Sequence, residues 1–269
     1  MTAFWSDWSV PLCAAWLDAG IALYVAGLLF GTSAARRAGI AGLIGAALAG
    51  YIAVSTTVMT DATPADFPNA LSLVLRQTHF GAMQLVALTA WICLLLGGRQ
   101  RMLAWLAALT LVAARAATGH AADAGVLTPA LIAHVLHLSG MAIWAGTVWL
   151  AGLANAEDPG TEMLAQQVST LATWALGLIV LTGLWNLERV THGAPTRASP
   201  DYLRWLWAKG ALIAGAVGLG ALNRWRYLPG VMRRDPQAKR YFWRILRVEG
   251  LLLAAVVIVA ARLAVTMAD

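Results

Sequence analysis

The sequence predicts an all-helical integral membrane protein, a polytopic bundle forming a single transmembrane domain over residues 1–269. Hydrophobic residues make up 60% of the chain and charged residues only 12%, about half the charged fraction of a typical soluble domain. The mean hydropathy is +0.69. Apolar runs of about twenty residues, the length that a helix needs to cross a bilayer, recur along the whole chain. We therefore expect about eight transmembrane helices.

These apolar runs are predicted to be helices because an open sheet would leave backbone groups unpaired in lipid. A short surface helix is also expected at Leu71–Gln77, after a loop from Asp61 to Asn69 that contains two prolines. The expected spans lie at about 9–31, 38–59, 78–97, 102–119, 128–152, 164–187, 204–223 and 242–266.

The basic residues predict the orientation of the chain. Twelve of the 19 lie in the first, third and seventh loops or at the neighbouring span ends, and four lie on the opposite side. Because cytoplasmic loops are enriched in Lys and Arg, both termini are expected to face the periplasm. The fifth loop, with Glu157, Asp158 and Glu162, is acidic although it falls on the cytoplasmic side. The same asymmetry explains the net charge of +6, so we expect membrane lipid and no nucleic acid as a partner.

The fifth span carries the residues around which the chain is organised. Thr128 is a suitable N-cap, and Pro129 fits the first helical turn, where its missing N–H costs nothing. His134 and His137 lie in the first three turns of this helix. Met141, Trp144 and Val148 continue the same spacing of three and four residues, so they are predicted to share one face with the histidines.

Histidines and methionines gather on the predicted external side. His79 opens the third span and His120 follows the fourth, while Met83 and Met141 lie four residues after His79 and His137. Neutral imidazole binds copper, zinc, iron and nickel, whereas a thioether favours copper. We therefore predict a metal site formed by His79, His120, His134, His137, Met83 and Met141. The alternatives are that the methionines only fill space in the bundle, and that paired histidines ligate haem b. His192, in the sixth loop, is expected to be solvated.

Ionisable residues inside the predicted spans form a second group of candidates. Each needs a partner or water in the bundle, because an exposed charge in lipid is costly. Asp18 is expected to pair with Arg115, Lys209 or Arg262, and Glu249 to lie near Asn223 and Arg224. The alternative is that these residues only hold helices together.

Several classes of protein are not indicated by the sequence. It contains no GxxxxGK[ST] nucleotide-binding loop, no GxSxG and no HExxH motif. We therefore expect neither an ATP-driven pump nor an enzyme, with a redox role as the second interpretation.

An ordered set of short motifs resembles the bacterial copper-resistance membrane proteins of the CopD/PcoD family. The motifs, spread over residues 117–265, are GHA at 119–121, LHLSGMAIWAG at 136–146, TGLWN at 182–186, Tyr202…Leu206…Lys209, ALNR at 221–224, and Glu249. The resemblance implies a multi-pass inner-membrane protein involved in copper homeostasis that moves copper from the periplasm toward the cytoplasm, beside a periplasmic CopC-like carrier. His120 and His137 correspond best to the histidines of the family.

Three interpretations remain open at this point. The first is a copper permease, the second a membrane redox protein of cytochrome b type, and the third an accessory subunit that binds copper without transporting it.

Overall fold

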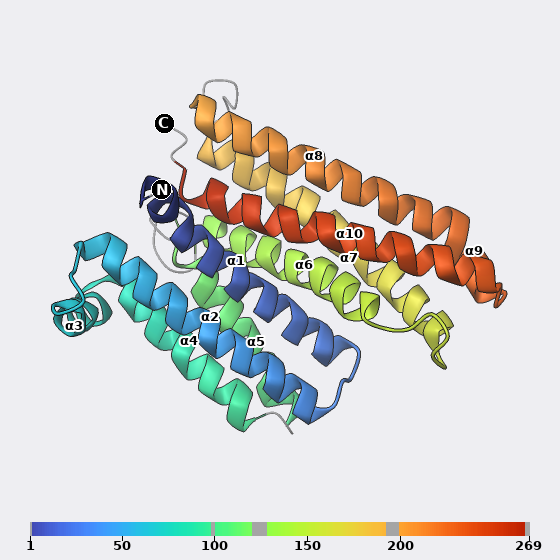
Figure 1. Ribbon diagram of the computed structural model, residues 1–269, viewed down its shortest axis with the longest axis horizontal. Coiled ribbons are helices and arrows are strands. Elements are labelled where there is room, and N and C mark those ends of the chain that lie inside the picture. Colours follow the sequence, from blue (N-terminus) through green and yellow to red (C-terminus); the bar gives the residue numbers. More distant parts are fainter. Residues whose placement is uncertain (1, 98–99, 120–127, 192–198, 267–269) are drawn as a thin grey trace. The chain divides into compact units, whose positions relative to one another are not determined.

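The computed structural model describes residues 2–97, 100–119, 128–191 and 199–266, and within these ranges the chain is helical without a β-strand. The predicted all-helical fold is confirmed. The elements, shown in Figure 1, are α1 (Thr2–Leu29), α2 (Ala34–Thr60), α3 (Phe67–Gln77), α4 (His79–Leu96), α5 (Arg101–Ala116), α6 (Pro129–Gly152), α7 (Thr161–Val190), α8 (Pro200–Leu222), the π-helix η3 (Asn223–Tyr227), α9 (Leu228–Met232) and α10 (Pro236–Ala264).

The eight predicted spans correspond in order to α1, α2, α4, α5, α6, α7, α8 and α10. Six helical segments among the described residues are long and apolar enough to cross a membrane. The remaining two are α5, which has 16 residues, and α10, which carries six charged residues: Lys239, Arg240, Arg244, Arg247, Glu249 and Arg262. A multi-pass membrane protein is thus supported, while the count of eight spans and the orientation stay predictions. The short helix expected before the third span is present as α3, and it begins at Phe67 because Pro68 fits its first turn.

The helices form two compact units, one ending at Ser139 and one beginning at Gly140, so α6 contributes its first turns to one unit and its last turns to the other. In the first unit α1 packs on α2 and α5, and α4 packs on α2, α3 and α5. Close approach of α2 and α4 depends on Gly45, where an added Cβ would lie 2.5 Å from the ring of Trp91. The Trp91 indole also donates a hydrogen bond to the carbonyl of Ala41 (2.8 Å).

In the second unit α8 packs against α10, and η3 joins α8 to the short helix α9. The end of α6 is fixed to α10, because Trp149 donates its indole N–H to the carbonyl of Gly250 (2.7 Å). The acidic fifth loop meets the basic seventh loop at one end of this unit. Lys239 lies 2.6 Å from the carboxylate of Glu162, and Arg247 donates to the carbonyl of Gly152 (3.1 Å). This pairing places the acidic loop and the basic loop at the same end of the unit.

Candidate functional site

The start of α6 is built as the sequence predicts. The Thr128 hydroxyl accepts a hydrogen bond from the backbone N–H of Leu131 (3.3 Å), so Thr128 is the N-cap of this helix. His134 and His137 lie one turn apart on α6 and are both half-buried. Leu131 is buried in a small cluster with Ala116 and Ala117, which end α5. Met83 of α4 packs against this cluster.

His79 is the first residue of α4, and its side chain is exposed. The Thr78 hydroxyl caps the helix by accepting from the N–H of Gly81 (2.9 Å). The ring Nε2 of His79 lies 2.9 Å from the carbonyl oxygen of Ala117. Since a carbonyl only accepts, Nε2 carries the proton in this contact, and Nδ1 of the neutral ring keeps a free lone pair. A histidine that donates one N–H to a carbonyl while the other nitrogen binds a metal is a common arrangement in metal sites.

These contacts bring three chain segments together in the first unit: the start of α4, the end of α5 and the start of α6. The histidines expected to hold a metal belong to the same segments. His120 falls outside the described residues, but it lies only three positions after Ala117, a reach of at most about 10 Å. Within the described ranges, no three His, Cys, Asp or Glu side chains come together closely enough to hold a metal ion. The full set with His120 therefore stays a prediction, and so does the role of Met141, which is half-buried one turn beyond His137.

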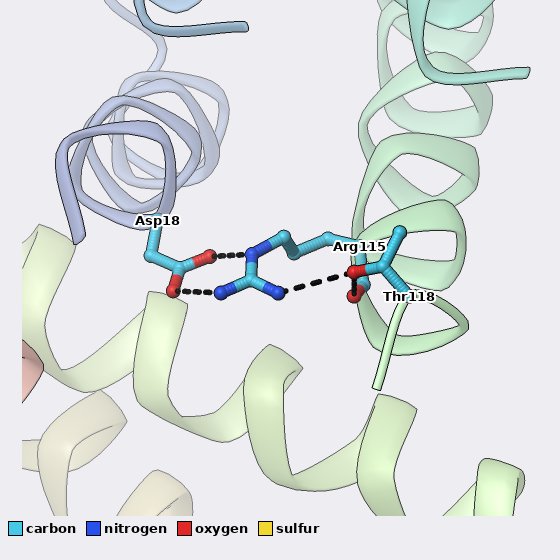
Figure 2. Close-up of polar contacts among 3 residues, drawn as sticks. All are labelled: Asp18, Arg115 and Thr118. Carbon is cyan, nitrogen blue, oxygen red and sulfur yellow. Dashed lines mark hydrogen bonds and ion pairs between the residues drawn. The ribbon is translucent and has the colours of Figure 1, made fainter. Parts of the chain in front are cut away.

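Asp18 of α1 forms an ion pair with Arg115 of α5, as Figure 2 shows. The guanidinium group binds both carboxylate oxygens, through Nε (2.9 Å) and one terminal nitrogen (3.2 Å). The other terminal nitrogen donates to the hydroxyl of Thr118 (3.2 Å), and the guanidinium carbon lies 5.4 Å from the centre of the Tyr51 ring. The expectation that Asp18 is paired inside the bundle is confirmed, and Arg115 is its partner. This pair joins α1 to α5.

Lys209 of α8 is half-buried and forms no ion pair with a described residue. The structure thus gives Lys209 no partner comparable to that of Arg115, and its role stays open.

The second unit contains a partly open cavity of about 270 Å³, lined by residues of α6, α7, α8, η3 and α10. Its walls are mostly apolar, and seven lining side chains carry polar atoms: Trp144, Ser169, Thr173, Asn223, Arg224, Trp225 and Glu249. Glu249 and Asn223 are each only 3% exposed. The sequence-based expectation that Glu249 lies near Asn223 and Arg224 is confirmed, because all three line this one cavity.

Hydrogen bonds hold the polar groups of the cavity in place. Glu249 accepts a hydrogen bond at Oε1 from the indole of Trp144 (3.0 Å). Asn223 donates its amide to the carbonyl of Phe242 (3.1 Å). Arg224 is bound to α7, donating to the hydroxyls of Ser169 (2.9 Å) and Thr173 (3.2 Å). Helix α8 passes close to the carboxylate, since a Cβ added at Gly220 would lie 3.3 Å from Oε1.

Sequence reasoning did not find the partners of these groups. Trp144 was expected only to share a face with the histidines, and Ser169 and Thr173 were not singled out at all. Hydroxyl residues are common in membrane helices, where they also bond to their own backbone. Nothing in their spacing therefore separates Ser169 and Thr173 from other helical serines and threonines.

Comparison with known proteins finds a family match for the C-terminal part of the chain. Residues 162–263 match the family described as copper resistance protein D, CopD. This segment is CopD-like. No curated protein and no solved structure matches the chain. The CopD-like segment contains α7, α8, η3, α9 and nearly all of α10, and it supplies every residue of the cavity lining except Trp144 and Val148. The predicted metal ligands all precede it in the sequence.

Proposed function

We propose that the protein is an inner-membrane copper-binding protein that moves copper from the periplasm toward the cytoplasm. Copper is the metal that we propose because residues 162–263 match a family described as copper resistance protein D. Copper is the substrate in this proposal, captured by His79, His120, His134 and His137 at one end of the first unit. The observation that carries the proposal is the contact of His79 with Ala117 beside the start of α6, because it joins the three segments that hold these histidines.

The order of ligand types along the helices favours passage inward. Each methionine lies one turn further into its helix than a histidine: Met83 after His79 on α4, and Met141 after His137 on α6. Imidazole binds both oxidation states of copper, whereas a thioether favours the softer Cu(I). Copper that enters between the histidines therefore meets thioether ligands about 6 Å deeper along each helix axis.

A b-type haem protein is the second candidate, and the geometry of His79 argues against it. Haem ligation requires histidines on two facing helices, so His79 would have to be the partner of a histidine on α6. Its Nε2 is bonded to the Ala117 carbonyl. Only Nδ1, the ring nitrogen closer to the backbone, remains to reach an iron at the centre of a large flat ring.

The third candidate, an accessory subunit that binds copper without transporting it, uses the same ligands. A periplasmic copper carrier of the CopC type is the partner that we propose for either role, since the exposed ring of His79 is accessible from solution.

The purified full-length protein separates these candidates. Elemental analysis is expected to find copper, and the absorption spectrum is expected to lack the Soret band of haem. A Soret band in protein that holds no copper would overturn the proposal. Copper uptake into vesicles that contain the protein is expected to exceed uptake into protein-free vesicles. Copper binding without such uptake would identify the accessory subunit instead.

A further inference from the structure

The cavity in the second unit contains the carboxylate of Glu249, which has no direct counter-ion among the described residues. Glu249 is 3% exposed, and the described residues place no basic side chain within ion-pair distance of it. Its one hydrogen bond comes from the neutral indole of Trp144, to Oε1. The second oxygen, Oε2, accepts no hydrogen bond from the described part of the chain. A carboxylate in a mostly apolar cavity is costly unless a ligand completes its partners.

A second acceptor in the same lining is also incomplete. The amide nitrogen of Asn223 is used by the Phe242 carbonyl, while its side-chain oxygen Oδ1 is buried without a hydrogen-bond partner. Asn223 opens the π-helix η3, a wide turn of the kind that is rare in helices and frequent at functional sites. Two independent features, a buried unpaired amide oxygen and a local π-helix, therefore mark Asn223 in the same cavity lining as Glu249.

The basic residue of the lining is held away from the carboxylate. Arg224 is the one titratable group besides Glu249 among the residues that line the cavity. Its terminal nitrogen donates to the carbonyl and the hydroxyl of Ser169 and to the hydroxyl of Thr173, all on α7. The wall contributed by α6 adds Trp144 and Val148, and that of α8 adds no charged group. The positive charge of Arg224 can thus lower the energy of an anion in the cavity, but Arg224 does not serve as a partner of Oε2.

The chemistry of the free acceptors selects the ligand. Two oxygens that only accept need a cation or a hydrogen-bond donor. They are poor copper ligands, since the cavity lining offers neither imidazole nor sulfur. They are also too few for a hard metal ion, because Mg²⁺ requires about six oxygens and Ca²⁺ six to eight. A proton, by contrast, requires only one carboxylate oxygen to bind to and one further acceptor for the hydrogen bond that the resulting O–H donates. The cavity volume of about 270 Å³ is large enough for several waters, each of which occupies about 30 Å³ in the liquid.

We propose that Glu249 is a proton-binding site, loaded through water in the cavity and stabilised by Trp144 at Oε1 and by Asn223 as a second acceptor. In this reaction the carboxylate binds at Oε2 a proton that comes from the bulk solution through water in the cavity, so the protonated acid is the only product and no electron moves. Trp144 lies on the α6 face that also carries His137 and Met141, about 10 Å further along the helix axis than His137. If copper passes along that face, release of the proton from Glu249 balances the positive charge of the copper ion. This last link rests on the proposed function, whereas the proton site does not.

Infrared difference spectroscopy of the full-length protein in lipid vesicles tests the site without copper. Spectra are recorded between about pH 9 and about pH 5, for the wild type, Glu249→Gln and the control Glu162→Gln. Glutamine keeps the size of the side chain and can still accept from Trp144. Glu162 is a fair control because Lys239 binds it outside the cavity. A carboxyl C=O band is expected on acidification in the wild type and in Glu162→Gln, and its absence is expected in Glu249→Gln. In D₂O the band should shift, because water reaches the site.

Identical spectra for the wild type and Glu249→Gln would overturn the proposal. So would a band that is lost equally in both variants, or one that does not shift in D₂O. A band change produced by Na⁺ at constant pH and absent in Glu249→Gln would show a hard metal ion as the ligand, which also contradicts it. Glu249→Gln is expected to bind as much copper as the wild type, since the histidines lie outside the cavity lining. If the wild type binds no copper, the proposed function fails while the infrared result still decides the proton site.

Discussion

The ion pair between Asp18 and Arg115 makes the sharpest prediction about stability. It joins α1 to α5 in the first unit, with two contacts of 2.9 and 3.2 Å between the guanidinium and the carboxylate. The side chains are only 13% and 10% exposed. Replacing Asp18 by leucine leaves the Arg115 charge buried, with Thr118 and the Tyr51 ring as its remaining partners among the described residues. Replacing Arg115 by methionine leaves the carboxylate without its cation.

The burial of the pair determines how much stability its loss is expected to cost. Breaking a buried ion pair by removing one partner costs about 3–5 kcal/mol, whereas replacing both partners by apolar residues is close to neutral. We therefore expect Asp18→Leu and Arg115→Met each to lower the free energy of unfolding by about 3 kcal/mol or more. The double variant should be more stable than either single variant. The exposed pair between Asp201 and Arg204 provides a matched control, because its N–O distance is also 3.0 Å while its side chains are 68% and 72% exposed. Asp201→Asn should change stability by less than about 1 kcal/mol.

A double-mutant cycle in detergent, followed by unfolding with SDS, measures these differences. The cycle isolates the coupling between the two side chains from their separate effects. The reasoning is refuted if the single losses are below about 1 kcal/mol and add up in the double variant. It is also refuted if Asp201→Asn costs as much as Asp18→Leu.

Three further predictions follow from other parts of the structure. A cysteine placed at Asp235 should be labelled only from the cytoplasmic side of the membrane, and labelling from outside would reverse the predicted topology. Gly45→Ala should cost about 1–3 kcal/mol, because the new Cβ meets Trp91 at 2.5 Å. Gly42→Ala on the same helix meets nothing within 4 Å, so equal thermal melting of the two variants would contradict this. Gly220→Ala should shift the infrared band of Glu249, because its Cβ would lie 3.3 Å from Oε1; an unchanged band would show that the carboxylate does not stay near α8.

Local signals in the sequence predicted the helices well. Thr128 and Pro129 marked the start of α6, and the hydrogen bond from Leu131 to the Thr128 hydroxyl confirms it. The predicted ends of helices differ from the structure where the sequence is amphipathic or has no capping residue. α10 begins at Pro236, before the expected residue 242, because Asp235 caps it by accepting from the N–H of Gln237 (2.9 Å). α5 ends at Ala116, short of the expected residue 119.

Contacts between helices could not be predicted from the sequence. Asp18 had three possible basic partners by depth, and the choice of Arg115 depends on how α1 packs on α5. The cavity around Glu249 depends on five elements meeting, and the π-helix at Asn223 has no periodicity that distinguishes it from α8 in the sequence. For the predicted metal ligands, the structure shows some of the contacts between their helices but not a complete set of ligands. The contact of His79 with Ala117 shows that the start of α4 meets the end of α5, while the arrangement of the histidines themselves stays a prediction.

Copper binding by single histidine variants tests the central claim most directly. Two imidazoles one turn apart on α6 do not complete a coordination sphere, so each remaining histidine should matter. His120→Ala, His134→Ala and His137→Ala are each expected to lose most of the bound copper while staying folded in detergent, and the control His192→Ala is expected to keep it. Because the ligands must be neutral imidazoles, affinity in the wild type should also fall below about pH 6.5. The decisive measurement is the copper content and affinity of purified His137→Ala beside His192→Ala: a loss confined to His137→Ala agrees with the proposed site, and unchanged stoichiometry and affinity in His137→Ala would contradict it.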